Sequence, residues 1–232
     1  MSLIELENVS RTYRVGKHEV SALHPSRLRI DSNELVVFLG PSGSGKTTLM
    51  NLIAGLDQPS SGRVQVNDIV LSEQDRRGRT EFRKKYVGIV FQFHNLIPTL
   101  TARENVEIVA SLVHRRDKVE QALASVGLSG RMDHFPHEMS GGEQQRVAIA
   151  RALVKDPPII LGDEPTGNLD GATGQTVIQL FYDIHAQGKC LLIVTHNVLL
   201  CQIATRVITL RDGRIQSDEP NNNRKTPQQV EW

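Results

Sequence analysis

The chain has 232 residues, of which 39% are hydrophobic and 23% charged, and its formal net charge is +1. This is the composition of a globular domain large enough to bury its own core, and the near-neutral charge argues against nucleic acid as a partner. Cys190 and Cys201 lack CxxC spacing, so they indicate buried thiols in a reducing compartment rather than a disulfide framework or a zinc site.

The first 94 residues are predicted to be mostly β-structure, because their apolar residues alternate or run together in short segments. The expected strands are residues 3–9, 20–30, 35–39, 63–66, 69–71 and 87–91. Residues 11–17 are expected to form a polar turn, and a helix at 47–54 is expected to follow the glycine-rich segment 40–45.

The middle of the chain changes to helical patterns, which predicts a helical subdomain at about 95–154. A short amphipathic helix is expected at 118–126. Two capping-box pairs open the longer helices: Thr101 with Glu104, and Ser140 with Glu143.

Strands return in the last third of the chain, together with one further helix near 173–187. The expected strands are residues 159–162, 190–195, 206–210 and 214–216, the last two joined by a hairpin turn at 212–213. Strands that alternate with helices around an all-helical insert predict an α/β fold. The predicted single domain covers 1–218, with its core and β subdomain at about 1–94 and 155–218, and residues 219–232 form a polar, flexible tail.

The segment after the strand at 35–39 matches the phosphate-binding pattern GxxxxGK[ST] without a mismatch. Glycines let backbone N–H groups surround phosphate oxygens, and the next helix adds the positive end of its dipole. Lys46 supplies a charge to the β- and γ-phosphates, and the Thr47 hydroxyl is a ligand for Mg²⁺. The predicted nucleotide-binding residues are Gly40, Pro41, Ser42, Gly43, Ser44, Gly45, Lys46, Thr47 and Thr48.

Two adjacent carboxylates end the predicted strand at 159–162. Asp163 is expected to hold Mg²⁺ through water, and Glu164 to polarise the water that attacks the γ-phosphate. Alone, an acidic pair after a strand is more often a solvated turn. The phosphate-binding segment upstream strengthens the prediction, because parallel sheets gather ligand groups at the carboxyl ends of their strands.

Residues 139–146 read Met-Ser-Gly-Gly-Glu-Gln-Gln-Arg and closely resemble the signature motif of ABC ATPases. Methionine replaces the usual leading leucine, and glutamate replaces the usual glutamine, as is common in the lipoprotein-releasing and macrolide-exporting branch. A serine before two glycines at a helix start offers a hydroxyl, backbone N–H groups and a dipole to an anion. The resemblance implies that two copies meet head to tail, each contacting the ATP of the other through Ser140, Gly141, Gly142 and Glu143.

Four more residues match motifs of the same family. Gln92 resembles the Q-loop glutamine, which reaches Mg²⁺ and the attacking water, and Asp170 resembles the D-loop aspartate, which shapes the facing subunit's site. His196 resembles the histidine that contacts the γ-phosphate, and Tyr13 the aromatic that stacks on adenine. The ordinary alternatives are a structural histidine and a surface aromatic in a turn.

The resemblance covers residues 4 to about 217 and implies a P-loop NTPase core of the ABC type, with an N-terminal antiparallel β subdomain and an inserted α-helical subdomain. The implied function is a transport-coupled ATPase that binds ATP and Mg²⁺, forms a homodimer in the ATP state and powers integral membrane permease subunits. Export or extraction is favoured over import.

The chain is expected to act at the cytoplasmic face of the inner membrane without crossing it. No apolar run reaches the ~20 residues of a spanning helix, and the first residues do not read as a signal peptide. Phe93, Leu96 and Ile97 lie in the predicted loop 91–100 and indicate a permease-docking surface. The alternative is that Phe93, Leu96 and Ile97 pack between the α/β core and the helical subdomain.

Two other functions fit part of the sequence. A non-transport ABC ATPase acting on nucleic acid or the ribosome would carry a long coiled coil or a second ATPase domain, and neither pattern is present in these 232 residues. A P-loop kinase would leave the signature and D-loop segments unexplained.

Overall fold

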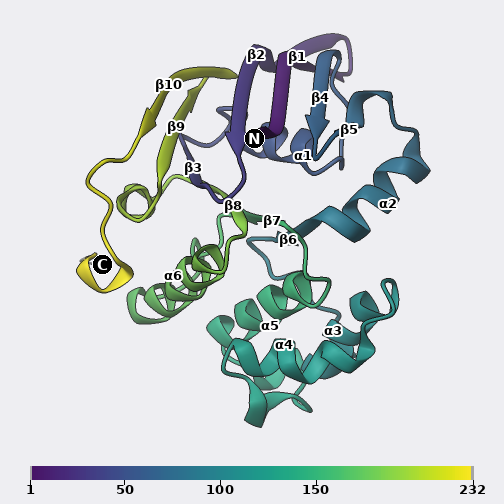
Figure 1. The fold of residues 1–232 in the computed structure, drawn as a ribbon, viewed down its shortest axis with the longest axis vertical. Helices are drawn as coiled ribbons and strands as arrows, with labels where there is room; N and C mark the ends of the chain where they lie inside the picture. Colours follow the sequence, from purple (N-terminus) through teal and green to yellow (C-terminus); the bar gives the residue numbers. More distant parts are fainter. Residues whose placement is uncertain (1, 231–232) are drawn as a thin grey trace.

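The computed structural model describes residues 2–230, which fold around two β-sheets (Figure 1). One sheet has four strands in the order β2-β1-β4-β5, and all its pairings are antiparallel. Its strands are β1 (Ser2–Val15), β2 (His18–Asp31), β4 (Ser61–Val66) and β5 (Ile69–Val70). This is the antiparallel β subdomain expected from the sequence.

The second sheet has six strands in the order β10-β9-β3-β8-β7-β6. All neighbours are parallel except the β9–β10 hairpin. Its strands are β3 (Leu35–Leu39), β6 (Val87–Val90), β7 (Ile159–Asp163), β8 (Cys190–Thr195), β9 (Arg206–Arg211) and β10 (Arg214–Pro220). The carboxyl ends of β3, β7 and β8 therefore meet at one edge, where ligand groups collect in such sheets.

Helices cover both faces of the six-stranded sheet, as they do in doubly wound α/β folds. α1 (Lys46–Ile53) lies between the two sheets, and α6 (Gly171–Ala186) covers the opposite face (Figure 1). The other α-helices are α2 (Arg76–Tyr86), α3 (Ala102–Ser111), α4 (Val119–Ser125) and α5 (Gly141–Leu153). Short 3₁₀ turns lie at Leu71–Glu73, Arg116–Lys118, Ser129–Arg131, Pro136–Glu138, Val198–Gln202 and Pro227–Gln229.

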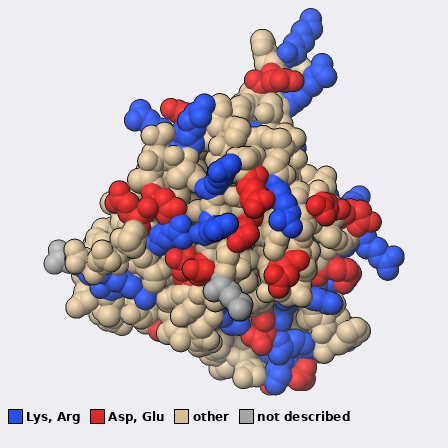
Figure 2. Space-filling model, turned by 45° about the horizontal axis from the view of Figure 1, so that its top comes forward, with Lys and Arg blue, Asp and Glu red and all other residues tan. Residues whose placement is uncertain are grey.

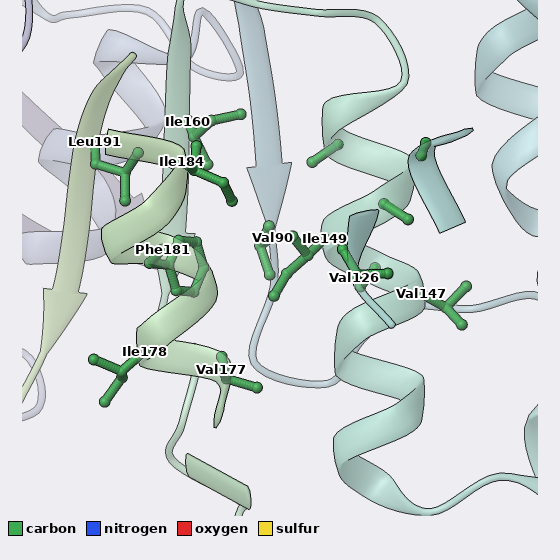
Figure 3. Packing of buried hydrophobic residues seen from close by; sticks show 14 of the residues in the cluster. Val90, Val126, Val147, Ile149, Ile160, Val177, Ile178, Phe181, Ile184 and Leu191 are labelled. Atoms are coloured by element: carbon green, nitrogen blue, oxygen red, sulfur yellow. The ribbon is translucent and has the colours of Figure 1, made fainter. Parts of the chain in front are cut away.

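The alternation of side chains along β3 divides the apolar interior into two cores. Val36 and Phe38 pack with α1 and the antiparallel sheet, whereas Leu35 and Val37 face the core that includes α5 and α6. Figure 3 shows this second core, with Val90 of β6 next to Ile149 of α5. Helices α3, α4 and α5 also pack on one another, below the sheets in Figure 1.

The two predicted capping boxes are present. The Thr101 side chain accepts from the Glu104 backbone at the start of α3, and Ser140 accepts from Glu143 at the start of α5. In both pairs the glutamate carboxylate accepts from the backbone N–H of the cap residue, so two of the otherwise unpaired helix-end donors are satisfied.

One local expectation is wrong, and one helix was not expected. The turn expected at 11–17 is confined to residues 16–17, because β1 and β2 continue pairing as far as Val15 and His18. The helix α2 was not predicted, since only Phe82 of its residues is buried and its sequence lacks an apolar stripe. Asp75 caps this helix by accepting from the backbone of Gly78.

The end of the chain also differs from the expected loose tail. β10 continues to Pro220, and beyond it the Asn221 amide donates to the carbonyls of Cys201 and Ala204. The Arg224 guanidinium lies over the Tyr182 ring, and Val230 is buried in the core on the α6 side. Residues 231–232 of the expected tail lie outside the described part of the chain.

Acidic and basic side chains are mixed on the face drawn in Figure 2, in keeping with the net charge of +1. Within residues 2–230, no helix is long and apolar enough to span a membrane.

Candidate functional site

The segment between β3 and α1 lines a pocket of about 360 Å³. Its walls come from residues 42–48, from Gln92 after β6, and from Asp163 and Glu164 at the end of β7. The pocket thus lies at the carboxyl edge of the parallel strands and brings together side chains separated by more than a hundred positions.

Gly45 is required by the close packing of the phosphate-binding segment. Its φ of +96° is a backbone conformation that side chains rarely adopt, and a Cβ there would lie 2.5 Å from the Ala22 carbonyl oxygen. The position therefore excludes every other residue type without a shift of β2 or of the loop.

Lys46 is almost fully buried beneath this segment, with 6% of its surface exposed. Its ammonium group donates to the carbonyls of Gly40 and Pro41 at 2.7 and 2.9 Å. Burial lowers the pKa of Lys46, while the charges of Glu164 and Asp163 oppose that shift. A polyanion in the pocket would offset the cost of this buried cation.

Ser44 provides a second indication of an anion. Its Oγ is buried and has no hydrogen-bond partner among the described residues, which is unusual for a buried hydroxyl. Together with the Lys46 ammonium and the first backbone N–H groups of α1, this donor fits the phosphates of a nucleotide.

Thr47 and Asp163 form the oxygen pair predicted for Mg²⁺. The Thr47 hydroxyl lies 3.3 Å from Oδ1 of Asp163, and Gln92 lines the same pocket. Burial raises the pKa of Asp163, an effect that a divalent cation would reverse. The described residues contain no cluster of three or more His, Cys, Asp or Glu side chains suited to a metal. Mg²⁺ held here would therefore depend on phosphate oxygens for further ligands.

Glu164 and His196 are in direct contact. Nδ1 of His196 lies 2.9 Å from Oε1 of Glu164, and the second carboxylate oxygen accepts from the Thr195 hydroxyl at 2.9 Å. The Glu164 side chain is 14% exposed, compared with 63% for His196. A carboxylate held in this way at the pocket wall can accept a proton from a water beside the terminal phosphate.

The signature residues do not line this pocket. The Ser140 Oγ accepts from the Glu143 backbone at 3.3 Å, and the Glu143 carboxylate accepts from the Ser140 backbone at 2.9 Å. Glu143 also pairs with Arg131 at 3.1 Å, and its hydrogen bonds with Ser140 lower its pKa. Glu143 thus has a structural partner on both carboxylate oxygens, beside the implied contact with a facing ATP.

Asp170 and Tyr13 lie outside the pocket lining as well. Asp170 caps α6 by accepting from the backbone of Thr173 at 3.0 Å. The Tyr13 hydroxyl donates to Asp57, and the Arg11 guanidinium lies 4.5 Å from the centre of the ring. The Arg11 guanidinium therefore covers one face of the Tyr13 ring.

Several residues of the site escaped sequence reasoning. Thr195 contacts Glu164, Arg131 pairs with Glu143, and Arg151 of α5 donates to the carbonyls of His94 and Asn95 in the loop after Gln92. Only Thr195 carries a signal in the sequence, since it directly precedes His196.

A family model described as ABC transporter matches residues 23–167. The chain belongs to the ABC transporter family. It is an ATPase of the ABC type, and its fold agrees with the α/β core, antiparallel sheet and helical insert expected for that family.

Relatives of this ABC ATPase include an uncharacterized ABC transporter ATP-binding protein of Thermotoga maritima, 42% identical over 94% of this chain and 95% of the relative. A putative ABC transporter ATP-binding protein of Mycoplasma pneumoniae is 44% identical over 99% of this chain but 50% of the relative. A macrolide export ATP-binding/permease protein of Hyphomonas neptunium is 44% identical over 94% of this chain and 35% of the relative. The chain thus spans about half the length of the Mycoplasma pneumoniae relative and about a third of the length of the Hyphomonas neptunium relative.

Among solved structures, an ATP-binding cassette of Methanocaldococcus jannaschii superposes with a TM-score of 0.87 at 39% identity. The match covers 96% of this chain and all of the cassette, which was captured as a dimer in a post-hydrolysis state bound to ADP and Pi.

Proposed function

We propose that this chain dimerises around two Mg-ATP and powers a separate membrane permease at the cytoplasmic face of the membrane, in export or extraction rather than import. The contact between Glu164 and His196 at the wall of the phosphate pocket carries the proposal. Glu164 supplies a base for the attacking water, and His196 lies beside it as a group that can contact the γ-phosphate.

In the proposed hydrolysis, each group of pocket residues has a separate role. Backbone N–H groups, Lys46 and Ser44 would hold the phosphates, and Thr47, Asp163 and Gln92 would hold Mg²⁺. Bound Mg²⁺ would neutralise charge that develops on the phosphate oxygens. Glu164 accepts the proton of the attacking water, and His196 orients the carboxylate and contacts the γ-phosphate. Adenine stacks on Tyr13.

The position of the signature supports the proposed dimer. Ser140 and Gly141 are exposed at the start of α5 and away from the pocket of their own chain, so they are free to meet the pocket of a second copy. The dimeric cassette of Methanocaldococcus jannaschii supports this arrangement. Asp170, at the start of α6, would lie close to the same interface.

The permease is proposed to dock beside the loop after β6. Phe93 and Ile97 in this loop are 74% and 42% exposed. A groove of about 370 Å³ next to it is lined by apolar residues, among them Leu56 and Phe91, together with the cations Arg83, Arg151 and Lys155. The macrolide export relative, whose name joins ATP-binding and permease functions, supports a membrane partner and the outward direction.

A glutamine at Glu164 tests the catalytic half of the proposal. Glu164→Gln keeps the shape of the side chain but removes the base, so turnover should fall by roughly 10²–10⁴-fold while ATP affinity is kept. The variant should then accumulate as an ATP-bound dimer, detected by size-exclusion chromatography with light scattering. Adding Ser140→Arg should abolish the dimer and leave ATP binding intact. Unchanged turnover of Glu164→Gln would remove Glu164 from the mechanism.

The docking half is tested separately. Phe93→Asp should prevent co-purification of the chain with its membrane partner, because a charge replaces an exposed apolar contact. Basal ATP hydrolysis should be unchanged, since Phe93 does not line the phosphate pocket. Co-purification that survives this change would place the permease contact elsewhere.

A further inference from the structure

Three consecutive residues at the end of β8 hold Glu164. The Val194 carbonyl accepts from the Glu164 backbone N–H at 2.8 Å, the Thr195 hydroxyl lies 2.9 Å from Oε2, and His196 contacts Oε1. Of the two side chains, Thr195 is 1% exposed and lies in a strand paired with β3, whereas the His196 side chain is 63% exposed. Thr195 is therefore the more constrained contact of the carboxylate.

The direction of the Thr195 hydrogen bond follows from the groups around its oxygen. Thr195 Oγ1 also accepts from the backbone N–H of Asn197 at 3.0 Å. The hydroxyl has a single proton, and a carboxylate oxygen accepts it. Thr195 therefore donates to Glu164, and the Asn197 N–H occupies a lone pair of the same oxygen.

The backbone of Glu164 shows why its side chain needs this support. Its φ is +46°, a left-handed conformation that costs a non-glycine residue about 1 kcal/mol or more. Such a conformation is kept only where surrounding contacts stabilise it, here the bond to the Val194 carbonyl. Backbone and side chain of Glu164 are thus aligned by the same strand end.

We propose that Thr195 is a positioning residue that orients the Glu164 carboxylate for proton transfer from the attacking water. The inference rests on the proposed function of Glu164 as the base. Thr195 does not line the phosphate pocket, whose wall here is formed by Val194 and Glu164, and its side chain is buried behind them. It acts on catalysis only through the carboxylate that it holds.

Thr195→Val is the direct test, since valine matches threonine in shape but can neither donate to Glu164 nor accept from the Asn197 backbone. A carboxylate misplaced by about 1 Å can cost up to ~10²-fold in rate, so kcat should fall by about 10- to 100-fold. The KM for ATP should stay within about twofold, because the groups that hold the phosphates are unchanged. Thr195→Ser keeps the hydroxyl and should restore most of the turnover.

Thr209→Val is the matched control. Thr195 of β8 and Thr209 of β9 both pair with Leu39, one on each side of β3. Among residues 2–230 the Thr209 side chain makes no hydrogen bond, so the same chemical change there should leave kcat near the wild-type value. Thermal unfolding of all variants separates loss of stability from loss of positioning.

Combining Thr195→Val with Glu164→Gln distinguishes the two proposals. If Thr195 acts through Glu164, its substitution should have no further effect on single-turnover hydrolysis once the base is gone. Normal turnover of Glu164→Gln would refute the base itself. A slow Glu164→Gln with a normal Thr195→Val would refute only the positioning. Three other results would also refute the positioning role of Thr195. These are a Thr195→Val defect that persists in the Glu164→Gln background, a raised KM for ATP, and a failure of Thr195→Ser to restore turnover.

Discussion

Lys155, which follows α5, is a partly buried cation beside the proposed docking groove, and its charge gives a quantitative prediction. Its ammonium donates to the carbonyls of Arg83 and Val87 at 2.8 and 2.5 Å. It has no carboxylate partner among the described residues. Burial, with a smaller contribution from the Arg83 charge, lowers its pKa from 10.5 to about 8.

The sign of the effect on stability follows from proton uptake. Because the folded pKa lies below the unfolded value, the unfolded chain binds more protons between about pH 8 and 10.5. The stability contributed by Lys155 therefore rises with pH through that window, at up to 1.36 kcal/mol per pH unit. Between pH 7.5 and 9.5 the gain is at most about 2 kcal/mol, because the remaining solvent contact weakens the burial effect.

Urea unfolding of the wild type and of Lys155→Met at both pH values measures this gain. Methionine keeps the length of the side chain but cannot be charged. The free energy of unfolding of the wild type, relative to that of the variant, should therefore increase by up to about 2 kcal/mol between the two pH values. The buried Cys190 and the partly buried Cys201 oppose the trend, since burial raises the pKa of the Cys190 thiol to about 12 and of the Cys201 thiol to about 11. That effect is common to both chains and cancels in the difference. A stability gap equal at the two pH values would refute the reasoning.

Two further substitutions test contacts made by the helix α5. Arg151→Met removes the donors to the His94 and Asn95 carbonyls, each at 2.6 Å, and should destabilise the chain by about 1.5–3 kcal/mol in urea and speed proteolysis of the loop after Gln92. An unchanged cleavage rate would show that Arg151 does not hold the loop. Gly142→Ala would place a Cβ against the Thr173 methyl group and displace the start of α5, so ATP hydrolysis should fall while nucleotide binding is kept. Adding Thr173→Ser removes that methyl and should recover activity; a defect that remains would point to another cause.

The phosphate segment and the helix starts could be predicted because their interactions are local. The bonds from Lys46 to Gly40 and Pro41, and those of both capping boxes, join residues no more than six positions apart. The helix α2 was missed because its residues are mostly charged and only Phe82 is buried. Such a helix is stabilised by its packing against the rest of the fold, and the spacing of apolar residues in the sequence does not indicate that packing.

The sequence by itself determined the residue types that can hold phosphate and Mg²⁺, and the order of strands and helices that carries them. Only the tertiary structure decided which distant groups meet: Thr195 with Glu164, Arg151 with the loop after Gln92, and Asn221 with the turn after His196. These contacts depend on the register of parallel strands and on helix packing, which are set by many weak interactions across the whole core. No single segment of the chain contains that information.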